Sequence, residues 1–495
     1  MPVKAPKTSR HVEVERKFDV VESTVSPSFE GIAAVAHVER APAESLDATY
    51  YDTAAQDLAR NRITLRRRTG GHDAGWHLKL PAGPDARTEV RAPLDTAKHG
   101  PQDGVPDELR DIVLAVVRDR PLEPVARIST DRETQVLYGA DGAALAEFSN
   151  DRVTAWAAGD PSAAEQQWRE WELELTNGTA DTELLDRLSN RLLDAGAVPA
   201  GHASKLARVL GARVAPDGTR PPADPIHRAV AEQVGELLVW DRGVRADADD
   251  AVHQMRVTIR KIRSLVAEAP DAPHNAWLLD ELRELANVLG AARDAEVLAE
   301  RYRRALDALP PELVRGRVRE RLVEGARRRY RTGLRRSLIA MRSQRYLRLL
   351  DALDAWVAEI PAPGGQPAPP VTIDAAYRKV RAAAKAAARV EPGAEHERDQ
   401  ALHRIRKRAK RLRYTAAATG AERVSEQAKA IQTLLGDHQD SVVSREHLIH
   451  QAEAARAAGE DTFTYGLLYQ READLAERCR GQLRGALRQL AKAVR

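Results

Sequence analysis

The chain is poor in cysteine and in aromatic residues. Of its 495 residues, one is a cysteine, Cys479, and 4% are aromatic. A single cysteine excludes an intrachain disulfide framework and a zinc site built from cysteines. It is also typical of proteins kept in a reducing compartment. We therefore expect a cytoplasmic protein.

Long apolar runs are missing as well. No stretch approaches the ~18 apolar residues that a membrane-spanning helix requires. The first residues, MPVKAPKTSR, are basic, but no apolar run follows them as it would in a secretory signal peptide. We expect no membrane partner.

Charge is unevenly distributed along the chain. From residue 224 onward there are 49 basic and 38 acidic residues, a net of +11, which leaves 28 basic and 35 acidic residues before it. An acidic part joined to a basic part indicates two different tasks, and 495 residues are enough for several domains. We predict a first domain over 1–212, a Pro/Gly-rich linker over 213–225, and an all-helical domain over 226–495. A second Pro/Gly-rich break, 360–371, divides that domain into halves of about 226–360 and 372–495.

The acidic part is predicted to be mostly β-strand, with helices near 28–38, 106–118 and 181–195. In the segment VEVERKF, Glu13, Glu15 and Lys17 share one face of a strand, and Val12, Val14 and Phe18 lie on the other face together with Arg16. For one strand the simplest interpretation is a solvated face of an antiparallel sheet. However, another strand carries Glu170, Glu172 and Glu174 in a row, which is costly unless cations lie against it. A sheet closed on itself, with its charged face inward, accounts for these rows and for the apolar outer faces.

Such a tunnel suits a phosphorylated ligand with a divalent metal. Arginine and lysine recognise phosphate, and clustered carboxylates bind Mg²⁺ or Mn²⁺. Phosphoryl transfer needs both the basic side chains that bind phosphate and the metal that the carboxylates hold.

The motif Glu13-x-Glu15-x-Lys17 resembles the ExExK signature of the CYTH superfamily, the triphosphate tunnel metalloenzymes. YYDT (50–53), LRRR (65–68), WHLKL, RTEV (87–90), TDRE, EWELEL (170–175) and SKL (204–206) follow in the order typical of that family. The resemblance implies a closed eight-stranded antiparallel β-tunnel with flanking helices. It also implies catalytic roles for Lys17, Glu170 and Glu172; phosphate binding by Lys17, Arg66, Arg68, Lys79, Arg87, Arg132 and Lys205; and metal binding by Glu13, Glu15, Glu89, Asp151, Glu172 and Glu174. Relatives often have two adjacent acids where this chain has Asn150 and Asp151.

The basic part contains an internal repeat. Aligned on His253 and His403, both copies carry basic residues at +3, +7, +8 and +10, and both have an LG-x-x-x-D segment downstream. On a helix, positions 0, +3, +7 and +10 form one stripe. A solvated basic face is the simpler interpretation of one stripe, but its repetition favours a shared polyanion surface. The stripe residues with their flanking bases are His253, Arg256, Arg260, Lys261, Arg263, His403, Arg406, Lys407, Lys410, Arg411 and Arg413.

This part resembles the CHAD domain, the conserved-histidine α-helical domain often found after CYTH. The resemblance implies two four-helix bundles related by a pseudo-dyad, with a basic surface that binds inorganic polyphosphate. We expect Asp294 and Asp440 to orient the basic side chains rather than to bind metal.

The sequence therefore predicts an α+β multidomain enzyme that hydrolyses tripolyphosphate or another triphosphate with Mg²⁺ or Mn²⁺, and association with polyphosphate deposits is part of the same hypothesis. Three alternatives stay open: an adenylyl cyclase or thiamine triphosphatase, a polyphosphate-binding scaffold with weak catalysis, and nucleic-acid binding. The last explains the basic part alone, and few aromatic residues lie among the basic stripes for base stacking. We expect no nucleic-acid partner.

Overall fold

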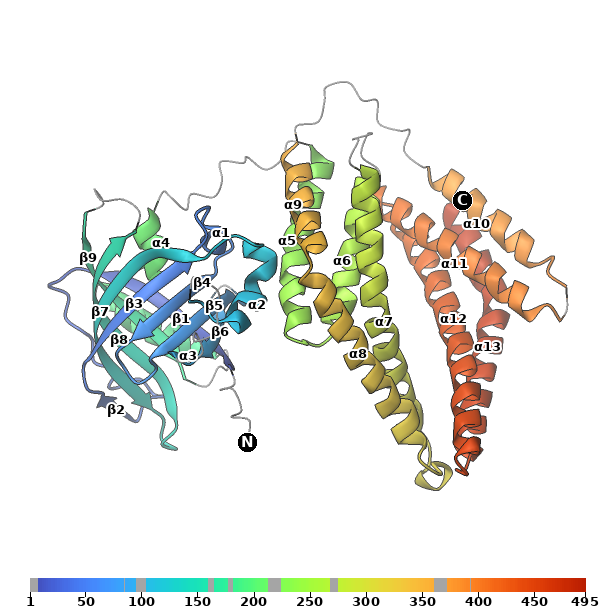
Figure 1. The fold of residues 1–495 in the computed structure, drawn as a ribbon, viewed down its shortest axis with the longest axis horizontal. Coiled ribbons are helices and arrows are strands. Elements are labelled where there is room, and N and C mark those ends of the chain that lie inside the picture. Colours follow the sequence, from blue (N-terminus) through green and yellow to red (C-terminus); the bar gives the residue numbers. More distant parts are fainter. Residues whose placement is uncertain are drawn as a thin grey trace. The chain divides into compact units, whose positions relative to one another are not determined.

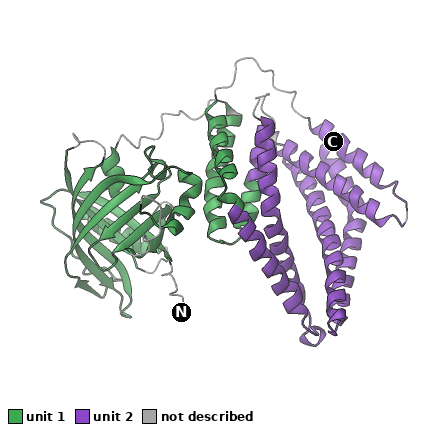
Figure 2. Ribbon diagram, in the orientation of Figure 1, with its two compact units in different colours: residues 1–258, 340–360 green, residues 259–339, 361–495 purple. Residues whose placement is uncertain are grey.

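The computed structural model describes residues 8–83, 85–94, 104–158, 164–176, 181–211, 224–267, 275–359, 372–391 and 393–495. The predicted break at 360–371, and all of the predicted linker except Asp224 and Pro225, lie outside these residues. The chain divides into two compact units, Met1–Thr258 with Ala340–Ile360 and Ile259–Ile339 with Pro361–Arg495 (Figure 2). This division is not the one expected from the sequence, and the domain limits 1–212 and 226–495 stay a prediction.

Eight antiparallel strands close into a barrel, as predicted (Figure 1). The order around the ring is β1-β6-β5-β4-β3-β7-β8-β9, and β9 pairs back onto β1. Two short strands, β2 (His37–Arg40) and β10 (Val198–Pro199), pair with β7 and β1 outside the ring. The strands of the ring are β1 (Ser9–Val20), β3 (Glu44–Asp52), β4 (Thr64–Thr69), β5 (Gly75–Pro81), β6 (Ala86–Ala92), β7 (Glu123–Tyr138), β8 (Ala144–Ala157) and β9 (Gln166–Leu175).

Two helices cover the apolar outer face of the barrel. Helix α2 (Asp107–Val117) packs on β4, β5 and β6, where Leu65, Trp76 and Leu78 are buried. Helix α3 (Thr182–Asp194) packs on β1 and β9. Because side chains alternate along a strand, the residues between these apolar ones point into the tunnel.

Helix α4 (Lys205–Leu210) packs against the inner face of the barrel instead. Its Leu206, Val209 and Leu210 share a core with Ile128 of β7 and Val153 of β8. Ile128 and Val153 lie an even number of residues from Arg132 and Asp151, so they line the tunnel. Helix α4 therefore fills part of the tunnel with apolar side chains.

One expected helix is wrong. Residues 28–36 form turns, and Gly31 has φ +81°, a left-handed conformation that interrupts a helix. Helix α1 (Asp57–Arg60) is a single turn after β3.

The rest of the chain is helical. The first half contains α5 (Pro225–Arg245), α6 (Ala251–Val266), α7 (Asn275–Asp307), α8 (Gly325–Met341) and α9 (Gln344–Ala358), with a 3₁₀ turn at Pro311–Leu313 and a π-helical turn at Glu320–Glu324 before α8. The second half contains α10 (Ile373–Ala387), α11 (Glu395–Ala418), α12 (Glu422–Ala457) and α13 (Phe463–Val494). Among the described residues, no helix combines the length and apolar character that a membrane crossing requires.

The two LG-x-x-x-D segments lie in the middle of the long helices α7 and α12. The helical periodicity of the sequence instead predicts separate helices over 274–289 and 293–307, and over 423–435 and 440–458. In α12 a Cβ on Gly436 would lie 3.5 Å from the guanidinium of Arg406, which is an ordinary van der Waals distance. A buried cluster joins residues of α7 and 309–323 to residues of α12 and α13. The pseudo-dyad between the halves stays a prediction.

Within the first unit, α2 also packs against α5, and α5 against α9. Arg118, directly after α2, is 3% exposed and donates hydrogen bonds to Asp351 (3.2 Å) and Asp354 (2.9 Å) of α9. Asp111 of α2 accepts from Arg245 (3.1 Å) and Arg342 (2.6 Å). The barrel is thus joined to helices of the basic half by ion pairs.

Candidate active site in the β-tunnel

The residues of the ExExK motif lie on β1, the strand at which the ring closes. Glu13, Glu15 and Lys17 point inward together because they alternate with outward residues. On one side Glu13 pairs with Arg87 of β6; on the other, Glu15 pairs with Glu174 and Lys17 with Glu172 of β9. The two glutamate rows predicted from separate parts of the sequence are therefore neighbours.

An acidic cluster near the inner helix is neutralised by three cations. Lys205 Nζ lies 2.8 Å from Asp151, 2.7 Å from Glu170 and 2.7 Å from Glu172. Arg132 donates two hydrogen bonds to Asp151, of 2.8 and 2.6 Å, and one of 2.6 Å to Glu172. The Nζ of Lys17 contacts Glu172 as well. Burial alone would raise the pKa of Glu172, but the charges of Lys17, Lys205 and Arg132 hold it well below its ordinary value.

Helix α4 places Lys205 in that cluster. The hydroxyl of Ser204 accepts a hydrogen bond of 3.1 Å from the backbone N–H of Ala207 and so caps the helix. The lysine at the first helical position then points to the acids while the following apolar residues pack on the tunnel wall.

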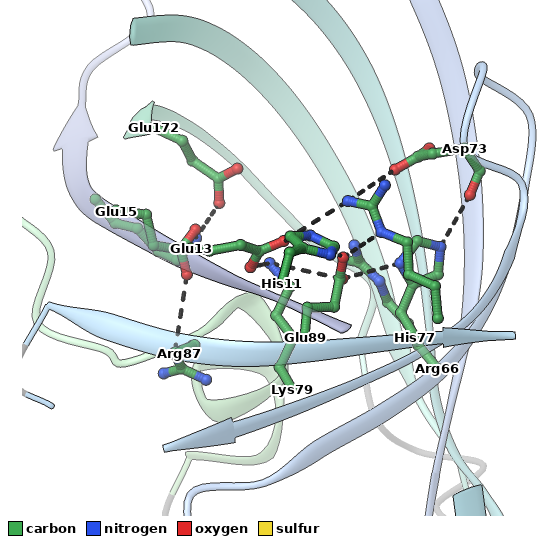
Figure 3. A network of polar contacts seen from close by, with 12 residues as sticks. His11, Glu13, Glu15, Arg66, Asp73, His77, Lys79, Arg87, Glu89 and Glu172 are labelled. Carbon is green, nitrogen blue, oxygen red and sulfur yellow. Dashed lines mark hydrogen bonds and ion pairs between the residues drawn. The ribbon is translucent and has the colours of Figure 1, made fainter. Parts of the chain in front are cut away.

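A second cluster lies farther along β1 (Figure 3). His11 Nε2 is 3.3 Å from Glu13 and 3.1 Å from Glu89 of β6. Lys79 of β5 reaches Glu13 at 2.5 Å. His77 Nδ1 is 2.9 Å from Glu89, and its Nε2 donates to the backbone carbonyl of Asp73 at 2.9 Å.

Between the clusters, two glutamates differ in protonation. Burial would raise the pKa of Glu15, but Lys17 and Lys79 lower it to about 2. Burial and the nearby charge of Glu13 raise the pKa of Glu174 to about 8. Glu174 thus has less positive charge near it than its neighbours have. A divalent cation bound beside it would favour its ionised form.

Arginines converge on the opposite wall. Burial, together with the charges of Arg66 and Arg132, lowers the pKa of Arg68 to about 9. Like charges gather this closely where an anion can bind between them. The Nε atoms of Arg66 and Arg68 are buried without a hydrogen-bond partner among the described residues, although Arg68 contacts Asp73 and Arg66 lies 3.3 Å from the hydroxyl of Tyr50.

The donor atoms fit a divalent metal. Two groups, His11 with Glu13 and Glu89, and Asp151 with Glu170 and Glu172, each have ligand atoms within 4.8 Å of one another. Oxygen-rich groups of this kind suit Mg²⁺ or Mn²⁺. In the second group, Lys205 already supplies a positive charge.

The structure brings the predicted tunnel residues together, and their roles stay predictions. Arg87 lies at the edge of the set, 3.8 Å from Glu15 and 2.6 Å from the carbonyl of Ala203. Five residues of the site were not predicted from the sequence: His11, Tyr50, Asp73, His77 and Arg91. His11, His77 and Arg91 each lie two residues from a selected residue of the same strand, and that signal would have found them. Tyr50 lies on β3, which carries no selected residue, and Asp73 lies in a turn.

Asn150, the residue before Asp151, faces away from the tunnel. Its Oδ1 accepts from Arg169 (2.8 Å) and from the indole N–H of Trp171 (3.1 Å). Asp151 alone of this pair points inward.

The two basic stripes of the helical region have matching burial. In both α6 and α11 the predicted stripe residues are half-buried beside a buried apolar face, and Lys261, Lys407 and Arg411 are exposed. Burial and the charges of Arg260, Arg406 and Arg413 lower the pKa of Lys410. Residues from both stripes therefore come close enough to affect one ammonium group. Asp440 lies near Arg406 and Arg301, whose charges favour its ionised form, while burial raises its pKa.

Comparison with known proteins decides the family. The family model of the CYTH domain matches residues 11–193, and that of the CHAD domain matches residues 228–449. The chain belongs to the proteins in which a CYTH domain precedes a CHAD domain. It is 72% identical to "Uncharacterized protein MT2285" of Mycobacterium tuberculosis, over 100% of this chain and 99% of that protein.

Two solved structures resemble parts of this CYTH–CHAD protein. "PptA from Streptomyces chartreusis" is 18% identical with a TM-score of 0.44, covering 54% of this chain and 99% of its own. The CHAD domain from the plant Ricinus communis is 25% identical with a TM-score of 0.40, covering 53% of this chain and 90% of its own.

Proposed function

We propose that the CYTH tunnel hydrolyses inorganic tripolyphosphate or another triphosphate with Mg²⁺ or Mn²⁺, and that the CHAD region binds inorganic polyphosphate. The observation that supports the tunnel activity is the juxtaposition, inside one closed barrel, of inward carboxylates and buried arginines. Neither set alone would suit a triphosphate, which needs its oxygens neutralised and its reacting phosphorus positioned.

The residues divide the work by charge. Arg66, Arg68 and Arg132 bind the phosphate oxygens, since guanidinium groups match them with paired N–H donors. Glu13, Glu15 and Glu174 would hold the divalent ion, which would neutralise phosphate oxygens and lower the pKa of a coordinated water. Glu172 orients the attacking water in line with the scissile bond.

Hydrolysis transfers charge to the leaving phosphate. Water adds to the terminal phosphorus, the bridging P–O bond breaks, and a water proton passes to a tunnel carboxylate. Lys17, held between Glu15 and Glu172, stabilises the leaving oxygen. This assignment gives each charged residue of the ExExK and ELEL motifs a chemical task.

Phosphate release from tripolyphosphate, ATP and thiamine triphosphate, each with Mg²⁺ and with Mn²⁺, tests the proposal. We expect metal-dependent release that the double variant Glu13→Gln/Glu15→Gln loses by at least about 100-fold. Glu39→Gln, a change at an exposed glutamate of β2, is the matched control. A cyclic nucleotide product from ATP would instead identify a cyclase, and absence of any turnover with intact polyphosphate binding would favour a scaffold.

The convergence of basic side chains around Lys410 supports polyphosphate binding. Arg260, Arg406 and Arg413 are close enough to lower the pKa of this lysine, and a linear polyanion would relieve the repulsion. We expect Arg406→Gln/Lys410→Gln to weaken polyphosphate binding and to reduce its salt dependence. Equal binding by this variant and wild type would contradict the assignment.

A further inference from the structure

The sequence around helix α8 contains no acidic residue over a long stretch. Between Glu324 and Asp351 there are nine arginines and no aspartate or glutamate. Neither the tunnel nor the two histidine-marked stripes include these residues. Arginines of this stretch are Arg327, Arg328, Arg329, Arg331, Arg335, Arg336, Arg342, Arg345 and Arg348.

Arginines at the start of this stretch and just before it are paired with carboxylates. Arg317 contacts Glu320 at 2.5 Å, Arg319 contacts Asp307 at 2.8 Å, and Arg327 contacts Glu324 at 2.8 Å. Pairs across a helical turn are the usual way in which an exposed arginine is accommodated. In the described part of the chain, no carboxylate pairs with Arg328, Arg331, Arg335 or Arg336, although all four are exposed.

Three of these side chains form one stripe. Arg328, Arg331 and Arg335 are spaced three and four residues apart, so they lie on one side of α8 over about 10 Å of helix axis. The opposite side is fixed by close packing, because a Cβ on Gly333 would lie 2.7 Å from the backbone nitrogen of Ala292 in α7. Helix α8 therefore cannot roll to bury the stripe.

We propose that Arg328, Arg331 and Arg335 form a second polyphosphate-binding surface, separate in sequence from the His253 and His403 stripes. The inference rests on the proposed polyphosphate binding. A straight row of guanidinium groups suits a linear polyanion that has no bases to be read. The single aromatic residue of α8, Tyr330, is partly buried, so the described helix offers no exposed ring for stacking nucleobases.

The test compares two full-length variants of equal charge. One is Arg328→Gln/Arg331→Gln/Arg335→Gln, and its matched control is Arg317→Gln/Arg319→Gln/Arg327→Gln, which removes three exposed arginines that already have carboxylate partners. Circular dichroism verifies that both remain folded. Binding of long polyphosphate is measured at several salt concentrations, alongside tripolyphosphate hydrolysis.

We expect the first variant to bind long polyphosphate about tenfold more weakly than wild type, or weaker still. The plot of log affinity against log salt concentration should become less steep, by about 2 in the magnitude of its slope. Each phosphate that the three arginines no longer neutralise contributes ~0.7 to this change. Tripolyphosphate hydrolysis should not change, because the tunnel is intact. The control variant should retain most of the affinity.

Four results would overturn the inference. Unchanged binding by the first variant, with binding by wild type intact, removes the α8 surface and leaves the proposed function standing. An equal decrease in the control variant would mean that net charge alone is responsible. Binding of a single-stranded RNA with the same number of phosphates is measured as well. If RNA binding requires the three arginines and polyphosphate binding does not, the surface is a nucleic-acid site. Absence of polyphosphate binding by wild type would refute the proposed CHAD function itself.

Discussion

The ammonium group of Lys205 lies where three carboxylates of two strands meet. Its distances to Asp151, Glu170 and Glu172 are between 2.7 and 2.8 Å, and its side chain is 8% exposed. The lysine thus occupies the position at which carboxylates of a tunnel would otherwise hold a cation. It also neutralises acids that would repel each other in a buried site.

Replacing this lysine should expose that repulsion. We expect Lys205→Met to lower the free energy of unfolding of the metal-free protein by about 3–5 kcal/mol, because a buried charge cluster loses one partner. Added Mg²⁺ or Mn²⁺ should raise the unfolding midpoint of the variant more than that of wild type. The control is Arg208→Met, on the same helix but paired with the partly exposed Asp19. If the two variants are equally stable without metal, Lys205 does not have this role.

Glu174 should couple metal binding to proton release. Its pKa of about 8 exceeds that of a free glutamate, so the native protein keeps this proton between roughly pH 4.5 and 8. A metal needs the carboxylate, so metal affinity should rise with pH up to about 8, with about one proton released per ion at pH 6.5. Without metal, the same group makes the native state less stable as pH rises through this window.

Calorimetric titration in two buffers of different ionisation heat measures the released proton. Glu174→Gln should abolish the buffer dependence and flatten the pH dependence of metal affinity. Equal proton release by wild type and variant would assign the proton to another group.

For individual residues of the site, the alternation of side chains along a strand explains which positions the sequence could predict. It placed Glu13, Glu15 and Lys17 on one face correctly, since adjacent residues of a strand must point to opposite sides. The same rule assigns Asn150 to the outer face. The contact of Asp73 with Arg68 could not be predicted, because Asp73 lies in the turn between β4 and β5, where no period applies.

Among the secondary-structure elements, the short helix α4 both packs inside the barrel and places Lys205 in the acidic cluster. It has six residues, too few to be stable alone, and its formation depends on the Ser204 cap and on packing inside the barrel. Since the helix carries Lys205, its packing also determines the electrostatics of the acidic cluster.

Loss of that packing should reduce both stability and activity. We expect Leu206→Ala to cost about 2–5 kcal/mol, as is usual when a fully buried leucine is truncated, and to lower kcat/KM through displacement of Lys205. Urea unfolding followed by tryptophan fluorescence measures the first effect, and phosphate release the second. Leu193→Ala, at a 39% exposed leucine of α3, should change neither, and similar losses from both substitutions would refute the special role of α4.

Element boundaries were harder to predict than element types. The helical repeat was visible from residue spacing, but α7 and α12 continue through their glycines, where composition suggested breaks. A glycine lowers helix propensity, but both glycines lie beside buried leucines, and burial of the apolar helix face outweighs this cost. The expected helix near 28–38 failed for the opposite reason, since Gly31 takes a left-handed turn.

For the whole molecule, the first compact unit is broader than the barrel. It includes α5 and α9, joined to α2 by the ion pairs of Arg118 and Asp111. Arg118 has φ +60° and ψ −133°, a conformation that costs a non-glycine residue on the order of 1–3 kcal/mol. The contact of its side chain with Asp351 and Asp354 compensates for that strain.

Two substitutions separate the strain from the ion pairs. Both Arg118→Ala and Arg118→Gly remove the ion pairs to α9, but glycine adopts a positive φ freely. We expect the alanine variant to be less stable than the glycine variant by about 1 kcal/mol, and amide exchange in α9 to increase in both. Equal stability of the two variants would show that the backbone at this position is not strained, and unchanged exchange in α9 would argue against the ion pairs.

Closure of the ring at β1 has a consequence for synthesis of the protein. Strand Ser9–Val20 leaves the ribosome well before Gln166–Leu175 and can complete its pairing only when that later strand has been translated. Until then its glutamates have no strand partner on that side, and Lys205 follows later still. The nascent chain must therefore hold an incomplete, acid-rich sheet through most of the first domain's translation, and late long-range pairing of this kind is slow. Synonymous codons that slow elongation after residue 210 should accordingly favour correct assembly of the tunnel.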